Sequence, residues 1–407
     1  MEIWNKKETA YWIRLALFNL VIVALLGVLL RYKIAFSFPF LQQKHVLHGH
    51  SHFAFSAWIS QMIMTLLLYH FKPQKSEMNA SLLLMANTVV AFCMLLAFIY
   101  QGYGPYSIFF SSLSTLINFY FCFRVWRWID KQNSVTTGDL YIKASIVFNF
   151  LSAIGTAYLV YLMINHISNP EHYLASVYYY LHFQYNGYFL FSCMGLFAYY
   201  LGSIQVQIPH ERTIFWLFAG SLIPAYLLSI IWAHLPIYLF ILVILSASVQ
   251  FGAWFYWIYQ IQKKSVEALI HPFVRKIWTL VVIAASIKFF LQMGSTIPSL
   301  SEFAFGFRPI VIAYLHLVLL GIVSLFLIGL SIKHQLISMN PFMSIALGVF
   351  IVGILLNETV LMLQGMSFLN LVTIPYSNEL LFSIAIIMFS GAFGLYISQK
   401  RARLKPE

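Results

Sequence analysis

The chain has 407 residues, of which 61% are hydrophobic, 18% aromatic and only 9% charged. A soluble domain needs about a quarter of its residues charged to keep its surface hydrated. The composition therefore excludes a soluble enzyme, a nucleic-acid-binding protein and a disordered chain. The formal net charge of +12 is to be interpreted first as a membrane-topology signal, before it is taken to indicate an acidic partner.

Apolar stretches long enough to cross a bilayer recur along the whole chain. A spanning helix needs about 20 apolar residues. The sequence predicts twelve such helices, at residues 11–30, 46–70, 80–101, 105–128, 141–165, 175–202, 213–233, 236–261, 273–293, 309–333, 341–364 and 378–398. The predicted fold is an all-α polytopic membrane bundle. Residues 1–407 are expected to form a single transmembrane helical domain, with no cleaved signal peptide.

The distribution of lysine and arginine predicts the orientation of this bundle. With the N-terminus in the cytoplasm, four of the 24 basic residues, Arg31, Lys33, Lys44 and Arg308, fall on the outer side and Lys288 falls within a span. The rest fall on the inner side. This bias predicts that both termini are cytoplasmic, in a membrane of the bacterial inner-membrane type.

With this orientation, histidines on four non-adjacent helices reach the same outer third of the membrane. They are His48, His50 and His52 on the second predicted helix, His182 on the sixth, His234 at the end of the seventh and His316 on the tenth. An imidazole inside a bundle needs a partner for each ring nitrogen, because unsatisfied polar groups are costly there. A haem iron or a copper ion can be one of those partners. The alternative is that each ring hydrogen-bonds to a neighbouring group and only packs.

The three histidines of the second helix cannot all serve one site. His48 and His52 are four residues apart and share a helix face, whereas His50 points about 200° away from them. The sequence does not choose between His50 and His52 as a ligand.

This pattern resembles subunit I of the haem-copper oxidase superfamily, which has twelve helices and both termini inside. In that family helices 2 and 10 supply the ligands of a low-spin haem, which implies His50 or His52 together with His316. The chain is also similar to twelve-helix haem- and copper-containing membrane proteins linked to nitric oxide tolerance, through His50-Ser51-His52 and the segment from His316 to Gly321. The sequence does not separate these two families.

The departures from the oxidase pattern concern its second metal centre. His182 and His234 match two of the family's three copper ligands, but the third position holds Leu235. Tyr314 stands where the family has the histidine that binds the high-spin haem, and tyrosinate is an uncommon haem ligand. The resemblance thus implies a bis-histidine haem of b type and an incomplete or altered second centre, and it leaves copper open.

Few charged groups accompany the histidines. Arg31 and Arg308 precede the two proposed ligand helices and are candidate partners for haem propionates. Arg308 lies eight residues before His316, or about 12 Å along a helix. For Lys288 we expect a buried ion pair or hydrogen bond rather than a proton path; for Glu358 both readings stay open.

The function expected is that of a haem-binding redox protein of the inner membrane, oxidase-like, acting in electron transfer or in the handling of oxygen or nitric oxide. A quinol or a cytochrome would be its electron donor, and further respiratory subunits are candidate partners. Whether it is an enzyme stays open. The alternative is a twelve-helix secondary transporter without haem, in which Pro224 marks the main break in a helix.

Overall fold

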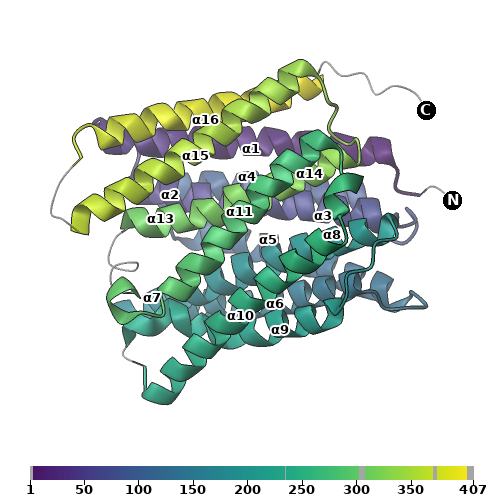
Figure 1. Ribbon diagram of the computed structural model, residues 1–407. Coiled ribbons are helices and arrows are strands. Elements are labelled where there is room, and N and C mark those ends of the chain that lie inside the picture. Colours follow the sequence, from purple (N-terminus) through teal and green to yellow (C-terminus); the bar gives the residue numbers. More distant parts are fainter. Residues whose placement is uncertain (1–2, 234, 302–307, 370–373, 401–407) are drawn as a thin grey trace. The chain divides into compact units, whose positions relative to one another are not determined.

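The computed structural model describes residues 3–233, 235–301, 308–369 and 374–400. Within them the chain is built from helices (Figure 1). In chain order these are α1 (Lys6–Ala35), α2 (Gln43–Phe53), η1 (Ala54–Ser60), α3 (Gln61–Phe71), α4 (Ala80–Gln101), α5 (Pro105–Asp130), α6 (Thr137–Ile164), α7 (Pro170–Leu181), η2 (His182–Phe189), α8 (Leu190–Ser203), α9 (Glu211–Ala225), η3 (Tyr226–Ala233), α10 (Ile237–Lys263), η4 (Val266–Leu269), α11 (Pro272–Gly294), α13 (Arg308–His316), η5 (Leu317–Ser324), α14 (Leu325–Lys333), α15 (Pro341–Leu369) and α16 (Ser377–Lys400).

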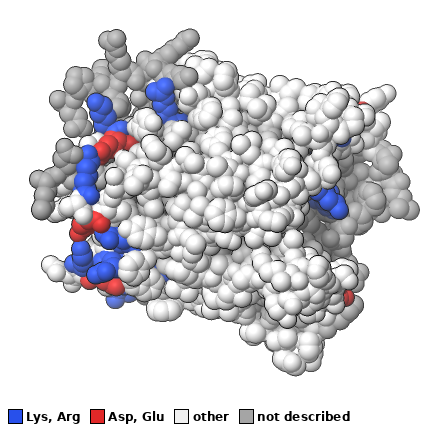
Figure 2. Space-filling view, turned by 180° about the vertical axis from the view of Figure 1, so that it is seen from behind, with Lys and Arg blue, Asp and Glu red and all other residues white. Residues whose placement is uncertain are grey.

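The all-α polytopic membrane bundle is confirmed. Among the described residues, eleven helices are long and apolar enough to cross a bilayer, and each corresponds to one of the predicted spans. The expected span at 175–202 is present as the continuous run of α7, η2 and α8. This run is not among the eleven, because its tyrosines, His182, Gln184 and Asn186 dilute its apolar residues. The face in Figure 2 is white over a broad area, and its charged side chains gather near the edges.

The chain forms two compact units. Unit 1 comprises Met1–Val125 and Leu327–Glu407, and unit 2 comprises Trp126–Phe326. In unit 1, α16 packs against both α1 and α15 (Figure 1). Close approach of α16 to α15 depends on Gly391, where an added Cβ would lie 2.5 Å from the backbone nitrogen of Phe350. In unit 2, α6 packs against α7, η2 and α8, and α9 packs against α10.

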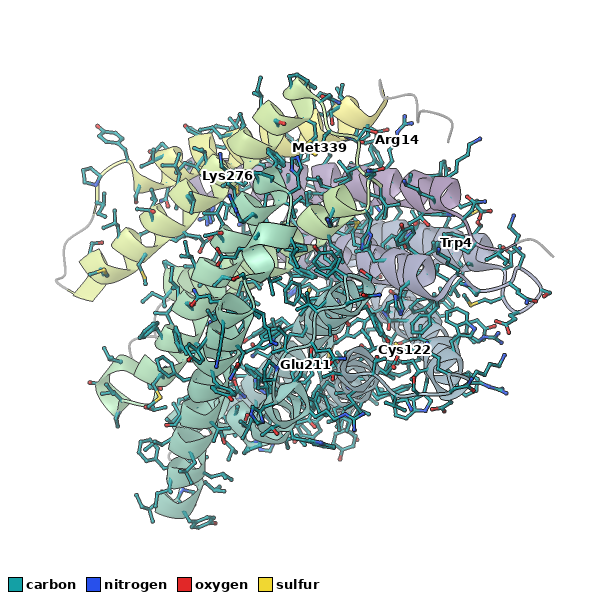
Figure 3. All side chains as sticks on the ribbon, turned by 45° about the vertical axis from the view of Figure 1, so that its right-hand side comes forward. Trp4, Arg14, Cys122, Glu211, Lys276 and Met339 are labelled. Atoms are coloured by element: carbon teal, nitrogen blue, oxygen red, sulfur yellow. The ribbon has the colours of Figure 1, made fainter. Side chains whose placement is uncertain are left out.

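The segments of unit 1 that were expected to be cytoplasmic meet at one end of its helices. The backbone N–H of Trp4 donates to the carbonyl of Pro73 (3.0 Å), and Lys6 Nζ donates to Gln335 Oε1 (3.3 Å). The Ser338 N–H donates to Gln399 Oε1 at 2.7 Å. Trp4, Arg14 and Met339 lie toward this end (Figure 3). The segments that the lysine and arginine count placed on one side of the membrane thus lie at the same end of this unit.

One predicted span, 213–233, is broken in its second half. Pro224 lies inside α9, and the helix continues as the 3₁₀ segment η3, with non-helical backbone at Ile230. Proline has no N–H and its ring clashes with the preceding turn. After Pro224 the helix tightens into η3, and the N–H of Tyr226 bonds to the carbonyls of Ile223 and Pro224 instead of the carbonyl of Leu222.

Candidate functional site

The candidate histidines that the structure describes lie at the start of a π-helix or within six residues before it. The described residues contain three π-helices. One begins two residues after His52, one begins at His182 and one begins directly after His316. π-helices are rare, and as single-turn bulges they occur frequently at functional sites. The π-helices are a structural feature that the sequence argument did not use. They occur next to the histidines that the sequence singled out.

Side-chain amides from neighbouring helices explain the π-helix η1. A π turn leaves carbonyls without their usual i+4 partner, so other donors must satisfy them. Asn19 of α1 donates from Nδ2 to the carbonyl of Ala57 at 2.8 Å, and Asn87 of α4 donates to the carbonyl of Ser56 at 3.1 Å. Asn19 is 0% and Asn87 1% exposed. These two buried amides stabilise the π conformation of η1. They thereby determine how the histidines of α2 are placed relative to α1 and α4.

His50 faces α1. An added Cβ on Gly27 would lie 3.8 Å from His50 Cε1, so the ring covers the glycine. The ring is also within hydrogen-bonding reach of the backbone of Val23. Its Nδ1 atom, however, is buried and makes no hydrogen bond. His50 therefore keeps a ring nitrogen unused in an environment where an unpaired polar atom is costly.

His48 and His52 face the opposite way, toward the end of α4 and the loop that follows it. His52 stacks on Phe98 with ring centroids 4.5 Å apart, and its Nε2 is hydrogen-bonded to the hydroxyl of Tyr103 at 3.1 Å. The His48 ring lies edge-on to Tyr103 at 4.6 Å. A tyrosine hydroxyl is protonated at neutral pH and can donate to His52. The two-face arrangement expected from the spacing is present.

Arg31 lies near the C-terminal end of α1, in the same unit as His50. Its charge acts electrostatically on both His50 and Glu358 of α15. Glu358 in turn accepts a hydrogen bond from Asn357 Nδ2 at 3.0 Å. Arg31 thus acts on both groups, and the sequence had not connected Glu358 with Arg31.

His182 is held by groups of its own unit. The side chain is 3% exposed. Its Nε2–H donates to the carbonyl of Leu222 at 2.9 Å, and its Nδ1 accepts from Asn186 Nδ2 at 3.4 Å. The Leu222 carbonyl is the one that the Pro224 break frees. The histidine thus joins η2 to the broken helix, and a metal at this ring would have to displace one of these partners.

His316 ends α13 and is half-buried, as is Tyr314. The Tyr314 ring lies edge-on to Tyr185 of η2, with centroids 6.1 Å apart. Arg308 is exposed at the first residue of α13. The helical register between Arg308 and His316 is the expected one. His316 and Tyr314 belong to unit 2, whereas His50, His52 and Arg31 belong to unit 1.

The copper ligand set predicted from the resemblance is not assembled by the described part of the chain. There, no group of three or more histidine, cysteine, aspartate or glutamate side chains has the arrangement of a metal site. His234 lies outside the described residues. Only His182 of the two matching histidines can therefore be placed.

Sequence reasoning missed the polar residues that support these histidines. Asn19 and Asn87 were not considered, although an asparagine inside an apolar span is a signal that could have found them. Lys288 was expected in a buried ion pair or hydrogen bond, and its ammonium donates to Gln292 Oε1 at 2.7 Å. The partner of Gln292 in turn is Gln250 of α10, at 2.8 Å, a contact between helices that one-dimensional spacing does not reveal.

Comparison with known proteins adds no relative to this description. No protein-family model matches the chain, and no curated protein matches it.

Proposed function

We propose that the protein binds haem in the membrane through histidines at or before its π-helices, with His50 as an axial ligand and His316 as the further ligand that the resemblance implies, and that it acts in electron transfer or in the handling of oxygen or nitric oxide. The membrane is of the bacterial inner-membrane type, and the electron donor is a quinol or a cytochrome. Further respiratory subunits are its candidate partners. The pairing of His50 with His316 rests on the sequence resemblance.

The coincidence of histidines and π-helices carries this proposal. A π-helix is retained at a cost, because it leaves backbone groups that other residues must satisfy. Asn19 and Asn87 meet that cost next to His50 and His52. If the histidines only packed against neighbours, there would be no reason for a π-helix next to them at three separate positions.

The unused nitrogen of His50 favours this residue over His52. A haem iron would satisfy a buried imidazole nitrogen that has no hydrogen-bond partner, and His50 Nδ1 is such an atom. Both ring nitrogens of an imidazole can act as metal ligands. His52, in contrast, already shares its Nε2 with the hydroxyl of Tyr103.

The other residues have supporting tasks. When bound, haem supplies one-electron chemistry, whereas the chain supplies ligands, burial and charge. Arg31 is close enough to act on His50 and would offset the negative charge of a propionate. His182 would hold η2 in place through Leu222. Copper at His182 and His234 stays a secondary proposal.

The test is haem content and spectrum in matched alanine variants. His50→Ala should reduce the haem retained by the purified protein at least tenfold and abolish the low-spin bands of the remainder, and His316→Ala should do the same. His52→Ala is the matched control, because it removes an imidazole of the same helix and should leave the bands in place. Loss of the bands in His52→Ala with retention in His50→Ala would reverse the assignment. Wild-type protein without haem would contradict the proposal.

A secondary transporter is the second candidate function, and the break of α9 at Pro224 favours it. Broken spanning helices line the substrate sites of many transporters. The carbonyl that this break frees is occupied by His182, so it serves the packing of unit 2. Solute uptake by proteoliposomes of haem-free protein would support this second reading.

A further inference from the structure

Three polar side chains form a continuous buried chain between α11 and α10 of unit 2. Lys288 is 1%, Gln292 7% and Gln250 2% exposed. Lys288 Nζ donates to Gln292 Oε1 at 2.7 Å, and Gln292 Nε2 donates to Gln250 Oε1 at 2.8 Å. The Nε2 atom of Gln250 is buried and makes no hydrogen bond.

The ammonium group determines the direction of this chain. A protonated lysine has donors only, so Gln292 must turn its oxygen toward Lys288 and its amide N–H₂ toward Gln250. Gln250 then uses its oxygen and is left with a donor. Both ends of the chain therefore present N–H groups, and both call for an acceptor, because a buried donor without a partner is costly.

The positive charge of Lys288 lacks an acidic partner among the described residues, since neither described salt bridge involves it. Its nearest aromatic contact is the ring of Phe289, with Nζ 4.0 Å from the centroid. Such a cation–π contact is weak compared with the cost of burying an ammonium in a membrane bundle. Glu302 of the same unit lies outside the described residues. A Glu302→Gln variant therefore tests whether this carboxylate is the counter-ion of Lys288.

The chain lies at the depth of the candidate histidines of unit 2. An added Cβ on Gly321 of η5 would lie 3.4 Å from Cβ of Ala284, so α11 and η5 pack closely there. The two segments belong to consecutive spans and run in opposite directions. Lys288, one turn beyond Ala284, therefore reaches the level of the residues just after His316. The charge of Lys288 also acts on His182.

We propose that Lys288 and the amide N–H₂ of Gln250 form a binding site for a carboxylate inside unit 2. A carboxylate balances one positive charge and accepts hydrogen bonds from several donors, which is what the two ends of this chain require. The carboxylate comes either from a haem propionate or from a long-chain fatty acid of the bilayer. The first source rests on the proposed function, and the second does not.

The propionate arm compares haem with its dimethyl ester, whose propionates carry no charge. Full-length apoprotein is reconstituted with each, and the rate of transfer to apomyoglobin is measured. Wild type should release the ester roughly tenfold faster or more, as expected for the loss of a charge-assisted pair. Lys288→Met and Gln250→Leu should release haem and ester at similar rates. Lys276→Met, the same substitution at an exposed position of the same helix, should behave like wild type.

The fatty-acid arm applies if wild-type protein binds no haem, an outcome that contradicts the proposed function but not this site. Oleate should then raise the melting temperature of wild type and of Lys276→Met, whereas oleyl alcohol should not. Lys288→Met should lose the shift. A variant that fails to fold is recognised by its elution profile, and Gln250→Leu then replaces it.

Two results would overturn the proposal. One is that Lys288→Met matches wild type in both arms. The other is that Glu302→Gln lowers the melting temperature and the double variant with Lys288→Met restores it, because Glu302 would then be an internal counter-ion. Unchanged stability of Glu302→Gln, together with loss of ligand discrimination in Lys288→Met, supports a carboxylate from outside the chain.

Discussion

The His182 ring connects the sequence motif to a specific backbone defect. Proline at position 224 disrupts the helix and frees the carbonyl of Leu222, and His182 Nε2 donates to that carbonyl at 2.9 Å. The sequence showed both residues but not their contact, because they lie on different helices.

We expect His182→Ala to destabilise the protein by about 1–3 kcal/mol, because it leaves the Leu222 carbonyl buried without a partner. The melting temperature in detergent measures this loss. His172→Ala is the control, since His172 is an exposed histidine of the same helical run. An unchanged melting temperature in His182→Ala would show that water or another donor replaces the ring.

A second histidine, His334, makes stability depend on pH at the end of unit 1 where the segments expected to be cytoplasmic meet. Burial, followed by the positive charges of Lys333 and Lys6, lowers the pKa of His334 to about 4. In an unfolded chain a histidine titrates near pH 6.5. Between these values the unfolded chain binds more protons than the folded one, so the folded state loses stability as pH falls.

The contribution of His334 should therefore be present in full above pH 6.5 and decline toward pH 4. Wild type should show a larger drop in melting temperature from pH 7.5 to pH 4.5 than His334→Gln, whose amide does not titrate. His166→Asn, at an exposed position, should keep the wild-type drop. Equal drops in wild type and His334→Gln would contradict this assignment.

At the residue scale, the sequence singled out candidate imidazoles but did not predict their surroundings. Spacing placed His50 and His52 on opposite faces, and the structure confirms that one meets α1 and the other meets Phe98 and Tyr103. Which face is the more buried depends on the packing of α1 and α4. That packing is a tertiary property, and no pattern within the second span encodes it.

At the element scale, apolar length predicted the spans well, and helix type was not predicted. The expected range 80–101 coincides with α4, because Asn79 caps its start and Gly102, with φ of 65°, ends it. The π-helices and the 3₁₀ segment η3 interrupt spans that the sequence presented as uniform. The break at η3 has a local cause, Pro224. The π-helix η1 instead meets amides from other helices, Asn19 and Asn87.

The packing of α15 against α16 gives an element-scale prediction. Gly391→Ala places a Cβ about 2.5 Å from the Phe350 backbone nitrogen, so the helices must separate, at a typical cost of about 1–3 kcal/mol. Gly348→Ala is the matched control, because no atom lies within 4 Å of its added Cβ, and in a helix this change should stabilise by roughly 0.4–1 kcal/mol. Melting temperatures should shift in opposite directions. A rise in both variants would show that the pair is loosely packed.

At the scale of the whole molecule, charge and hydropathy determine the class of protein and no more. A chain with 9% charged residues has eleven apolar helices of spanning length among its described residues. The same composition would suit a transporter. What favours a haem protein is local: an unused His50 nitrogen and π-helices beside the candidate histidines.

The central claim is that these histidines bind haem, and the most direct test is a reduced-minus-oxidised spectrum of the purified wild-type protein together with its haem-to-protein ratio. The account predicts sharp low-spin bands and at least one haem per chain, with both lost in His50→Ala. A featureless spectrum from protein expressed with ample haem, or bands that persist unchanged in both His50→Ala and His316→Ala, would contradict it.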